Sequence, residues 1–414
     1  MTQAAYDLVV VGGGIVGLAT AMECVGRFPA LRVAVVEKEP DVARHQTSHN
    51  SGVIHSGIYY RPGSMKARTC VEGARLMRAF CEAHGIAHAI CGKLIVATHP
   101  SELPALQELH RRGVANGIAG ISLLGPERLR EIEPHARGLQ ALHVPSAGVV
   151  DYAVVARAFA EVIRQRGGTI MTSALVRRLI RRQDAWVLET TAGSLMSRHL
   201  VTAGGLHADR VAAMAGAPRD LQIIPFRGDY YELIPLRRDL VRTMIYPVPD
   251  PALPFLGVHL TRGIDGRVHA GPNAVLALKR EGYRKTDVNL LDLWEMMRFS
   301  GFWRMACKHW AIGAGELVRA ASRRAFVRSL QRLVPEVCPS DVVPCESGVR
   351  AQAVDRRGVL VDDFNIVHGE NAMHLRNVPS PAATASISIA RVVAGMAASA
   401  LDVKYRLDEV KKLS

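Results

Sequence analysis

The pattern of hydrophobic positions is clearest at the N-terminus. An apolar run over residues 6–11 leads into a glycine-rich turn, and apolar residues then recur at helical spacing over residues 15–27. A second apolar run covers residues 32–36 and ends at Glu37. This order predicts a buried strand, a tight turn, a helix and a second buried strand parallel to the first.

Beyond this unit, predicted helices alternate with groups of predicted strands. The predicted helices cover residues 64–84, 101–116, 151–166, a segment opening near Asp209, 288–333 and 382–398. The predicted strands cover residues 91–98, then 169–172, 174–181, 186–191 and 195–200 in the order of a β-meander, a mostly antiparallel sheet over 221–272, and 349–375. Because no repeat or low-complexity linker separates these segments, we expect domains that interleave along the chain.

The glycine-rich turn carries the first candidate chemistry. Gly12 permits a tight turn, Gly14 lets the backbone approach a pyrophosphate, and Gly17 lets the helix pack closely on the strand. The N–H groups and dipole at the start of the helix favour phosphate. Glu37 stands 20 residues after Gly17, where it could accept hydrogen bonds from ribose hydroxyls. We therefore predict a dinucleotide site, with an ordinary strand–helix turn as the alternative.

Composition narrows the class of protein. The 414 residues are 49% hydrophobic and 22% charged, which predicts a soluble globular protein of two or three units. The seven cysteines are odd in number and form no CxxC pair, so we expect reduced thiols and no metal site. The first strand begins six residues from Met1 and no apolar run reaches about 18 residues, so we expect no signal peptide and no membrane span.

The charge indicates anionic partners. Lysine and arginine number 52 against 38 acidic residues, a net charge of +14 that suits nucleic acid, an anionic membrane or an acidic substrate. Residues 290–332 hold Trp294, Trp303 and Trp310 among many basic residues. This composition is typical of an interfacial membrane contact, and a helical subdomain with buried tryptophans is the alternative. We expect a cytoplasmic protein with a peripheral contact on the inner face of the membrane.

Several longer stretches are more specific than the glycine pattern. They are residues 49–60 (HNSGVIHSGIYY), 91–97 (CGKLIVA), 225–230 (PFRGDY), 271–277 (GPNAVLA) and 377–384 (NVPSPAAT). With them, the chain resembles FAD-dependent flavoproteins of the D-amino-acid-oxidase superfamily and, more narrowly, the L-2-hydroxyglutarate dehydrogenases and oxidases.

The resemblance implies an α/β fold in which a glutathione-reductase-type FAD-binding Rossmann fold is interleaved with an α+β substrate domain built on an antiparallel sheet. The FAD-binding domain would comprise residues 1–90, 151–220 and 341–414. The substrate domain would comprise residues 91–150 and 221–340, including the basic, tryptophan-rich helical region 288–333.

The resemblance also implies that FAD lies with its pyrophosphate on the first helix and its flavin beneath the substrate domain. The last helix would direct its N-terminal N–H groups and dipole at the flavin. The implied cofactor-binding residues are Gly12, Gly14, Ile15, Val16, Gly17, Glu37, Lys38, Thr47, Ser48, Ser51, Gly52, Val176, Ala203, Gly204, Arg350, Pro381, Ala382, Ala383 and Thr384.

Oxidation of a 2-hydroxy acid requires a base for the hydroxyl group and cations for the carboxylates. His55, in the stretch that passes the flavin, is the first candidate for the base and His259 is the second; each has a packed histidine as its alternative. Arg350 resembles the superfamily's carboxylate-binding position. Candidates that would bind the rest of a dicarboxylate are Lys66, Arg227, Tyr246, Asn273 and Tyr60.

The resulting hypothesis is FAD-dependent oxidation of L-2-hydroxyglutarate to 2-oxoglutarate by hydride transfer, with electrons passed to a membrane quinone or to oxygen. An amine oxidase of the same superfamily, acting on sarcosine or glycine, is the nearest alternative. No nucleic-acid partner is expected, because only 5% of residues are aromatic and no recognition module is present. A non-catalytic flavoprotein on a membrane surface is a third possibility, and the oligomeric state stays open.

Overall fold

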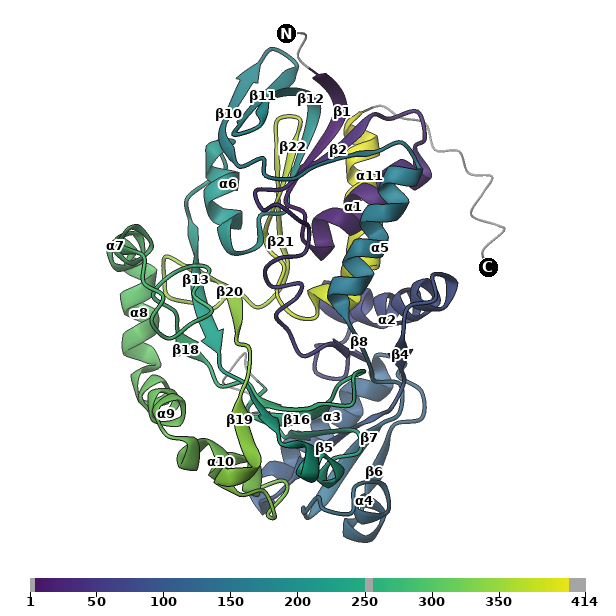
Figure 1. The fold of residues 1–414 in the computed structure, drawn as a ribbon, viewed down its shortest axis with the longest axis vertical. Coiled ribbons are helices and arrows are strands. Elements are labelled where there is room, and N and C mark those ends of the chain that lie inside the picture. The colour runs from purple at the N-terminus through teal and green to yellow at the C-terminus, as the bar shows by residue number, and fades with distance from the viewer. Residues whose placement is uncertain (1–3, 250–255, 402–414) are drawn as a thin grey trace.

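The chain forms two halves, each built on a large sheet, and crosses between them several times (Figure 1). The structure is a computed structural model that describes residues 4–249 and 256–401. The outermost residues of the predicted FAD-binding domain, 1–3 and 402–414, lie outside this description. The predicted mixed α/β fold class is confirmed, and the domain boundaries stay a prediction.

The first half is organised around β1 (Ala4–Val11), which pairs in parallel with β2 (Val33–Val36) on one side and β12 (Gly193–Thr202) on the other. The parallel sheet continues with β9 (Thr169–Met171) beside β2 and β22 (Ala372–Asn377) beside β12. All four residues of β2 are buried, as expected of a strand covered on both faces.

Helices cover one face of this sheet. α1 (Ile15–Arg27) packs against α5 (Tyr152–Gln165) and α11 (Ala382–Ala400), and α11 also packs against α2 (Met65–Ala83). The alternation of β1 divides its side chains between two hydrophobic clusters, one under these helices and one on the opposite face. Within the described residues, α11 alone is long and apolar enough to cross a membrane, and most of it is buried, as is usual for a core helix.

Side-chain caps fix where two of these helices begin. The Ser64 hydroxyl accepts a hydrogen bond from the Ala67 N–H at 3.2 Å, and the Asp151 carboxylate accepts one from the Ala153 N–H at 2.8 Å. Both caps were expected from the sequence, because serine and aspartate satisfy the free N–H groups of a first helical turn. The observed helices start one residue after each cap.

The predicted β-meander is shorter than expected. β10 (Val176–Arg182) and β11 (Ala185–Thr190) pair antiparallel with each other, and β11 pairs antiparallel with β12. The segment predicted as the first meander strand forms β9, which pairs in parallel with β2 at the opposite edge of the sheet. The prediction for this strand was wrong because β9 follows α5 in a crossover connection that extends the parallel sheet.

The second half is built on an eight-stranded sheet with the order β19-β14-β17-β16-β15-β5-β7-β6. Its centre combines β5 (Lys93–Ala97) with β15 (Met244–Pro247) and β16 (His259–Arg262), so segments 150 residues apart in sequence lie side by side. β5 runs parallel to β15, whereas most other pairs are antiparallel. The outer strands are β6 (Ser122–Leu124), β7 (Gln140–Val144), β14 (Tyr231–Leu233), β17 (Val268–Gly271) and β19 (Val342–Pro344).

One strand predicted in this sheet lies elsewhere. β13 (Leu221–Gly228) pairs along its whole length with β20 (Gly348–Asp355) and at one end with β18 (Val275–Leu276), which makes a separate three-stranded sheet. The prediction of one sheet over residues 221–272 was therefore wrong in this part, because the partner of β13 lies more than 100 residues away in sequence.

The predicted helical region 288–333 is four helices along one side of the molecule (Figure 1). They are α7 (Leu290–Arg298), α8 (Ser300–Lys308), α9 (Trp310–Ala321) and α10 (Arg323–Gln331). The other elements are α3 (Leu103–Ala115), α4 (Pro126–Ile132), α6 (Ala208–Met214), β3 (Val53–Ile54), β4 (His88–Ala89), β8 (Gly148–Val150) and β21 (Asn365–Gly369).

The close packing of α2 on α11 depends on Gly73. A Cβ atom at this position would lie 2.6 Å from the Ala385 Cα and 2.7 Å from the Thr384 carbonyl oxygen. We predict that Gly73→Ala lowers the free energy of unfolding by about 1–3 kcal/mol, because both atoms belong to backbone that cannot move aside. Thermal unfolding of the apoprotein would measure this loss.

The matched control is Gly313→Ala in α9, where a Cβ would meet no atom within 4 Å. This control should leave stability unchanged or raise it by about 0.5–1 kcal/mol, since alanine favours helix over glycine. Equal melting temperatures for Gly73→Ala and the wild type would contradict the packing argument.

Candidate active site

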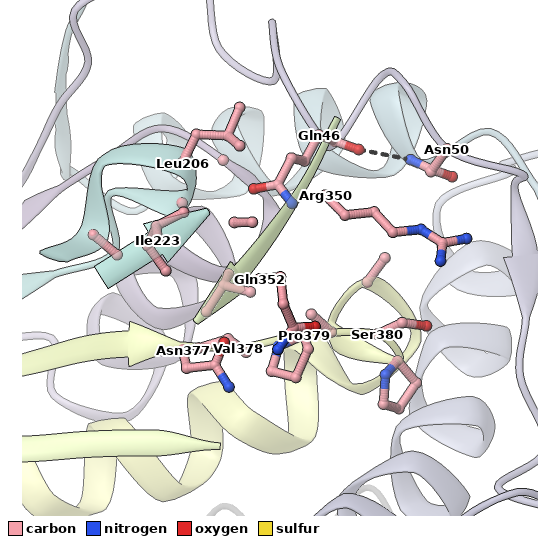
Figure 2. Close-up of a pocket in the computed structure, with 18 of the residues that line it drawn as sticks. Gln46, Asn50, Leu206, Ile223, Arg350, Gln352, Asn377, Val378, Pro379 and Ser380 are labelled. Atoms are coloured by element: carbon pink, nitrogen blue, oxygen red, sulfur yellow. Dashed lines mark hydrogen bonds between the residues drawn. The ribbon is translucent and has the colours of Figure 1, made fainter. Parts of the chain in front are cut away.

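A large cavity of about 1250 Å³ lies between the two halves. It is lined by the turn between β1 and α1, by most of residues 43–55, by β20 and by residues 375–384. Figure 2 shows part of this lining, with a hydrogen bond of 3.1 Å from Asn50 Nδ2 to the Gln46 carbonyl oxygen. The cavity exceeds the roughly 300–1,000 Å³ typical of small-molecule pockets, so it has room for a dinucleotide and a second small molecule.

At two glycines of the first turn, neighbouring backbone atoms lie too close to leave room for a side chain. Gly12 has φ +117°, and a Cβ there would lie 2.4 Å from the Ala203 carbonyl oxygen. A Cβ on Gly17 would lie 2.0 Å from the Gly12 carbonyl oxygen. Any side chain at either position would therefore separate α1 from the strands beneath it.

Gly14 is required for a different reason. Its φ of −77° and ψ of 172° are open to any residue, and the nearest atom to a Cβ would be Thr47 Oγ1 at 3.6 Å. Gly14, Ile15, Val16 and Gly17 all line the cavity, and Gly14 provides no side-chain cap for α1. The start of α1 thus presents backbone to the cavity, as a phosphate site requires.

Glu37 and Lys38 mark one end of the cavity. The Glu37 carboxylate accepts hydrogen bonds from the N–H groups of Gly13 (2.6 Å) and Glu39 (2.9 Å). Lys38 Nζ lies 2.8 Å from a Glu281 carboxylate oxygen and also contacts Glu39. Burial raises the pKa of Glu281, but hydrogen bonds from His207 and Lys38 outweigh it and lower that pKa to about 2.

Three ligand atoms at this end, from Glu39, His45 and Glu281, lie within 4.8 Å of one another, close enough to hold a metal ion. Lys38 Nζ contacts all three residues, with 3.0 Å to His45 Nε2. The lysine ammonium therefore already supplies the positive charge between the two carboxylates.

His259 lies at the other end of the cavity, on β16. Its Nδ1 is 2.9 Å from the Gly257 carbonyl oxygen, which can only accept a hydrogen bond, so Nδ1 carries the proton. Nε2 then holds a lone pair, and this buried atom has no hydrogen-bond partner among the described residues. The ring stacks on Tyr246, with 3.8 Å between ring centroids and 16° between planes.

His55 reaches the same end of the cavity from the first half. Its backbone N–H donates to Thr384 Oγ1 at 3.0 Å, and Thr384 also hydrogen-bonds the Tyr152 hydroxyl at 2.8 Å. This contact fixes the segment after β3 against the start of α11. The Nδ1 atom of His55 is buried without a hydrogen-bond partner.

Both histidines are held in the neutral form. Burial lowers the pKa of His259 to about 3, and the positive charges of Lys93 and Arg350 contribute to the shift. Burial lowers the pKa of His55 well below its usual value, and the positive charges of Lys93 and Arg350 lower it further. Each imidazole can therefore accept a proton at neutral pH.

Two cationic side chains line the cavity near these histidines. Arg350 projects from β20, and in the view of Figure 2 its guanidinium group lies between Asn50 and Ser380. Lys66 Nζ lies 3.0 Å from the Asp362 carboxylate and 5.0 Å from the centre of the Tyr60 ring. This end of the cavity can therefore bind carboxylate groups.

The comparisons with known proteins agree with this geometry. The family described as FAD dependent oxidoreductase matches residues 7–396. The L-2-hydroxyglutarate dehydrogenase of Indibacter alkaliphilus is 46% identical over 94% of this chain and 98% of its own length. The human mitochondrial enzyme of that name is 44% identical over 95% of this chain and 89% of its own length.

The chain belongs to the FAD-dependent oxidoreductase family. Among solved structures, FAD-bound L-α-glycerophosphate oxidase from Mycoplasma pneumoniae matches with a TM-score of 0.78 and 23% identity, covering 97% of this chain and 96% of that one. Glycine oxidase from Geobacillus kaustophilus matches with a TM-score of 0.69 and 19% identity, covering 98% and 97%. The predicted fold, the family resemblance and the cofactor FAD are confirmed.

The residues of this FAD-dependent oxidoreductase fit its cofactor. The glycine turn and the start of α1, where Gly14 provides no side-chain cap, suit the pyrophosphate, and Glu37 and Lys38 lie where the adenosine would bind. Val176, Ala203 and Gly204 line the same end of the cavity. The start of α11 lines the other end, where its N–H groups would favour negative charge on the flavin.

Most of the predicted site residues meet at the cavity, although contact with cofactor or substrate stays a prediction. Those that line it are Gly12, Gly14, Ile15, Val16, Gly17, Glu37, Lys38, Thr47, Ser51, His55, Tyr60, Lys66, Val176, Ala203, Gly204, Tyr246, His259, Arg350, Pro381, Ala382, Ala383 and Thr384.

Four predicted residues do not line the cavity. Arg227 Nε is bound to the Asp229 carboxylate at 2.7 Å, and the Asn273 side chain accepts from the Asp229 N–H at 2.7 Å. Both side chains belong to this buried cluster and do not line the cavity, so their assignment as substrate-binding residues stays a prediction. The Ser48 hydroxyl donates a hydrogen bond to the Ala43 carbonyl, and Gly52 adopts a φ of +67° in a turn. Both residues therefore stabilise the loop over residues 43–55 and do not face the cavity.

The sequence analysis assigned no role to Lys93, although this residue belongs to one of the specific stretches. Lys93 is 1% exposed and begins β5, in which every residue is buried. A lysine inside an otherwise apolar strand was the available signal, since lysine is rarely buried without a partner.

We predict that Gly14→Val abolishes FAD binding without unfolding the protein. The valine side chain would occupy the cavity beside the start of α1 and block approach of the pyrophosphate. FAD affinity, followed by flavin fluorescence during reconstitution of the apoprotein, should fall at least about tenfold.

Gly125→Val is the matched control. Gly125 is also an N-cap, with φ −73° and ψ 174°, and its Cβ would likewise have a nearest atom at 3.6 Å, but it lies outside the cavity. This control should bind FAD as the wild type does. Full flavin content in Gly14→Val would contradict the assigned phosphate site.

Proposed function

We propose that the enzyme oxidises the CH–OH group of L-2-hydroxyglutarate to give 2-oxoglutarate. The proposal is supported by relatives of that name at 43–46% identity over nearly the whole chain. The observation that carries it is the unpartnered Nε2 of neutral His259 in a cavity that also contains Arg350 and Lys66. A base for a hydroxyl group and cations for carboxylates are what this substrate requires.

When bound, FAD supplies the hydride acceptor. Arg350 would bind the carboxylate next to the hydroxyl group, and Lys66, which is paired with Asp362, would lie at the same end of the cavity. His259 Nε2 would accept the hydroxyl proton as hydride leaves the same carbon. The two negative charges of the substrate would raise the pKa of His259 and so make it a stronger base than in the empty cavity.

The decisive experiment is anaerobic reduction of the enzyme-bound flavin. L-2-hydroxyglutarate should bleach the visible flavin band, whereas its D-enantiomer and L-lactate should not. His259→Asn should slow this reduction by about 10²–10⁴-fold, because it removes the proton acceptor. His368→Asn, at an exposed position on β21, should reduce at the wild-type rate.

Other outcomes would redirect the assignment. Bleaching by sarcosine or glycine in place of the diacid would favour the amine oxidase alternative. If His55→Asn is slow and His259→Asn is not, His55 is the base.

We further propose that α7, α8 and α9 contact a membrane. Trp294, Trp303 and Trp310 are 55%, 50% and 72% exposed, and none of the residues of α9 is buried. The guanidinium of Arg298 lies 4.5 Å from the Trp294 ring. Exposed rings among basic side chains suit the headgroup region of anionic lipid.

The same helices suggest the electron acceptor. Lys308 and His309, at the junction of α8 and α9, line the cavity, and Trp310 next to them is exposed. An apolar acceptor in the membrane could therefore approach the cofactor from this side. We propose a membrane quinone as the acceptor, with oxygen as a slower one, and a location on the cytoplasmic face of the membrane.

We predict that the holoenzyme sediments with vesicles of mixed zwitterionic and anionic phospholipid. Replacing Trp294, Trp303 and Trp310 together by alanine should weaken binding at least about tenfold, because aromatic side chains dominate interfacial burial. The matched control replaces Val114, Leu139 and Leu236, three exposed apolar residues elsewhere, and should bind as the wild type does. Equal sedimentation of all three proteins would contradict the assigned surface.

A further inference from the structure

Lys93 is a buried cation whose role in the proposed reaction is not obvious from its sequence position. Nζ has no hydrogen-bond partner, and Lys93 forms no ion pair with any carboxylate among the described residues. Burying an ammonium group without a counter-charge costs several kcal/mol or more. Such a residue calls for a ligand that completes its environment.

The strand register shows which way Lys93 faces. β15 lies between β5 and β16, with Tyr246 opposite Ile95 and Ile245 opposite Leu260. Because side chains alternate along a strand, Lys93 projects from the same face of the sheet as Ile95, Tyr246 and His259. That face borders the cavity, since Tyr246 and His259 line it.

Aromatic rings separate Lys93 from the cavity. Nζ lies 4.1 Å from the centre of the Tyr246 ring and 5.1 Å from that of Tyr59, and both tyrosines line the cavity. Tyr246 in turn stacks on His259. Aromatic rings attract a cation but do not neutralise its charge. The positive charge of Lys93 therefore acts electrostatically on a ligand bound in the cavity.

Among the residues that the structure describes, no anion offsets this charge. The ionisable groups that surround or interact with Lys93 are Tyr59, Tyr246, His55, His259, Cys70 and Cys91. Burial raises the pKa of Cys70 to about 12 and raises the pKa of both tyrosines, so these groups are neutral at physiological pH. The other cations near His55 are Lys66 and Arg350, and the carboxylate of Asp362 is already paired with Lys66.

We infer that Lys93 is a positioning residue that selects dianionic ligands: its ammonium group, held behind Tyr246 and Tyr59, is the counter-charge for the second carboxylate of the substrate. The identity of that substrate rests on the proposed function. At an effective dielectric constant near 20, unit charges within about 10 Å attract strongly enough to change binding roughly tenfold or more. Contact with the ligand is not needed for an effect of this size.

The affinity for dianionic ligands should depend on pH. Burial lowers the pKa of Lys93 from 10.5 to about 7. Lys93 is therefore charged below about pH 7 and loses its proton as the pH rises above it, so dianion binding should be tight at low pH and weaken as the pH rises through 7. A bound dianion favours the protonated lysine, so binding above pH 7 should take up a proton.

The test uses non-reacting ligands and the FAD-bound enzyme. Glutarate and its monoamide, which lacks one negative charge, are titrated against the visible flavin spectrum between pH 6 and 9. In the wild type, glutarate should bind about tenfold or more tightly than the monoamide at pH 6, and less so at pH 9. Lys93→Met should abolish this preference and its pH dependence, while its affinity for the monoamide stays near that of the wild type.

Three further variants separate the effect of charge from that of structure. Lys93→Arg keeps the charge at every pH, so it should retain the preference for glutarate and lose the inflection near pH 7. Lys285→Met removes an exposed lysine that does not line the cavity and should behave as the wild type. Lys93→Gln serves as a second neutral variant if Lys93→Met does not bind FAD.

An unchanged glutarate-to-monoamide ratio in Lys93→Met or Lys93→Gln would overturn the inference. These titrations do not depend on turnover. If glutarate binding depends on Lys93 but L-2-hydroxyglutarate fails to reduce the flavin, the proposed substrate is wrong and the selection of dianions stands. If L-2-hydroxyglutarate reduces the flavin and the ratio is insensitive to Lys93, the proposed function stands and the role of Lys93 is wrong.

Discussion

The contact between Gly17 and the carbonyl group of Gly12 is the constraint on which the cofactor site depends. This contact leaves no room for a Cβ on Gly17. The carbonyl group of Ala203 likewise leaves no room for a Cβ on Gly12. α1 is thereby held close to the strands, with its first turn at the edge of the cavity. The favourable electrostatics of a helix start are available to a pyrophosphate only at this close approach.

The opposite end of the cavity is defined by an imbalance of charge. Lys66, Lys93 and Arg350 act on His55, while the carboxylate of Asp362 is paired with Lys66. Burial and these cations keep both histidines neutral. The positive potential raises the electrostatic free energy of the empty cavity, and binding of an anionic ligand lowers it. Affinity for an acid substrate and a neutral base for its hydroxyl group thus have one physical origin.

The two ends are joined because the chain crosses repeatedly between its halves. β5 comes from the first third of the sequence but lies between β15 and β7 in the second sheet. β13 pairs with β20, which carries Arg350 to the cavity. Thr384 at the start of α11 binds the backbone of His55. Each group at the reaction centre is therefore held by a segment distant in sequence, which makes its placement a property of the whole fold.

Local patterns in the sequence determined the β1–α1–β2 unit, the helices capped by Ser64 and Asp151, and the glycines of the phosphate site, because hydrophobic period, capping and backbone freedom act between near neighbours. A family-specific stretch indicated His55, and the family resemblance implied Arg350. Contacts between distant segments decided the other features. β9 pairs within the parallel sheet, and β13 pairs with β20 outside the large antiparallel sheet. Arg227 and Asn273 form hydrogen bonds with Asp229. Lys93 came to lie behind Tyr246 only through the register of β5 on β15. Such contacts between distant segments carry no local signal, so only the tertiary structure could decide them.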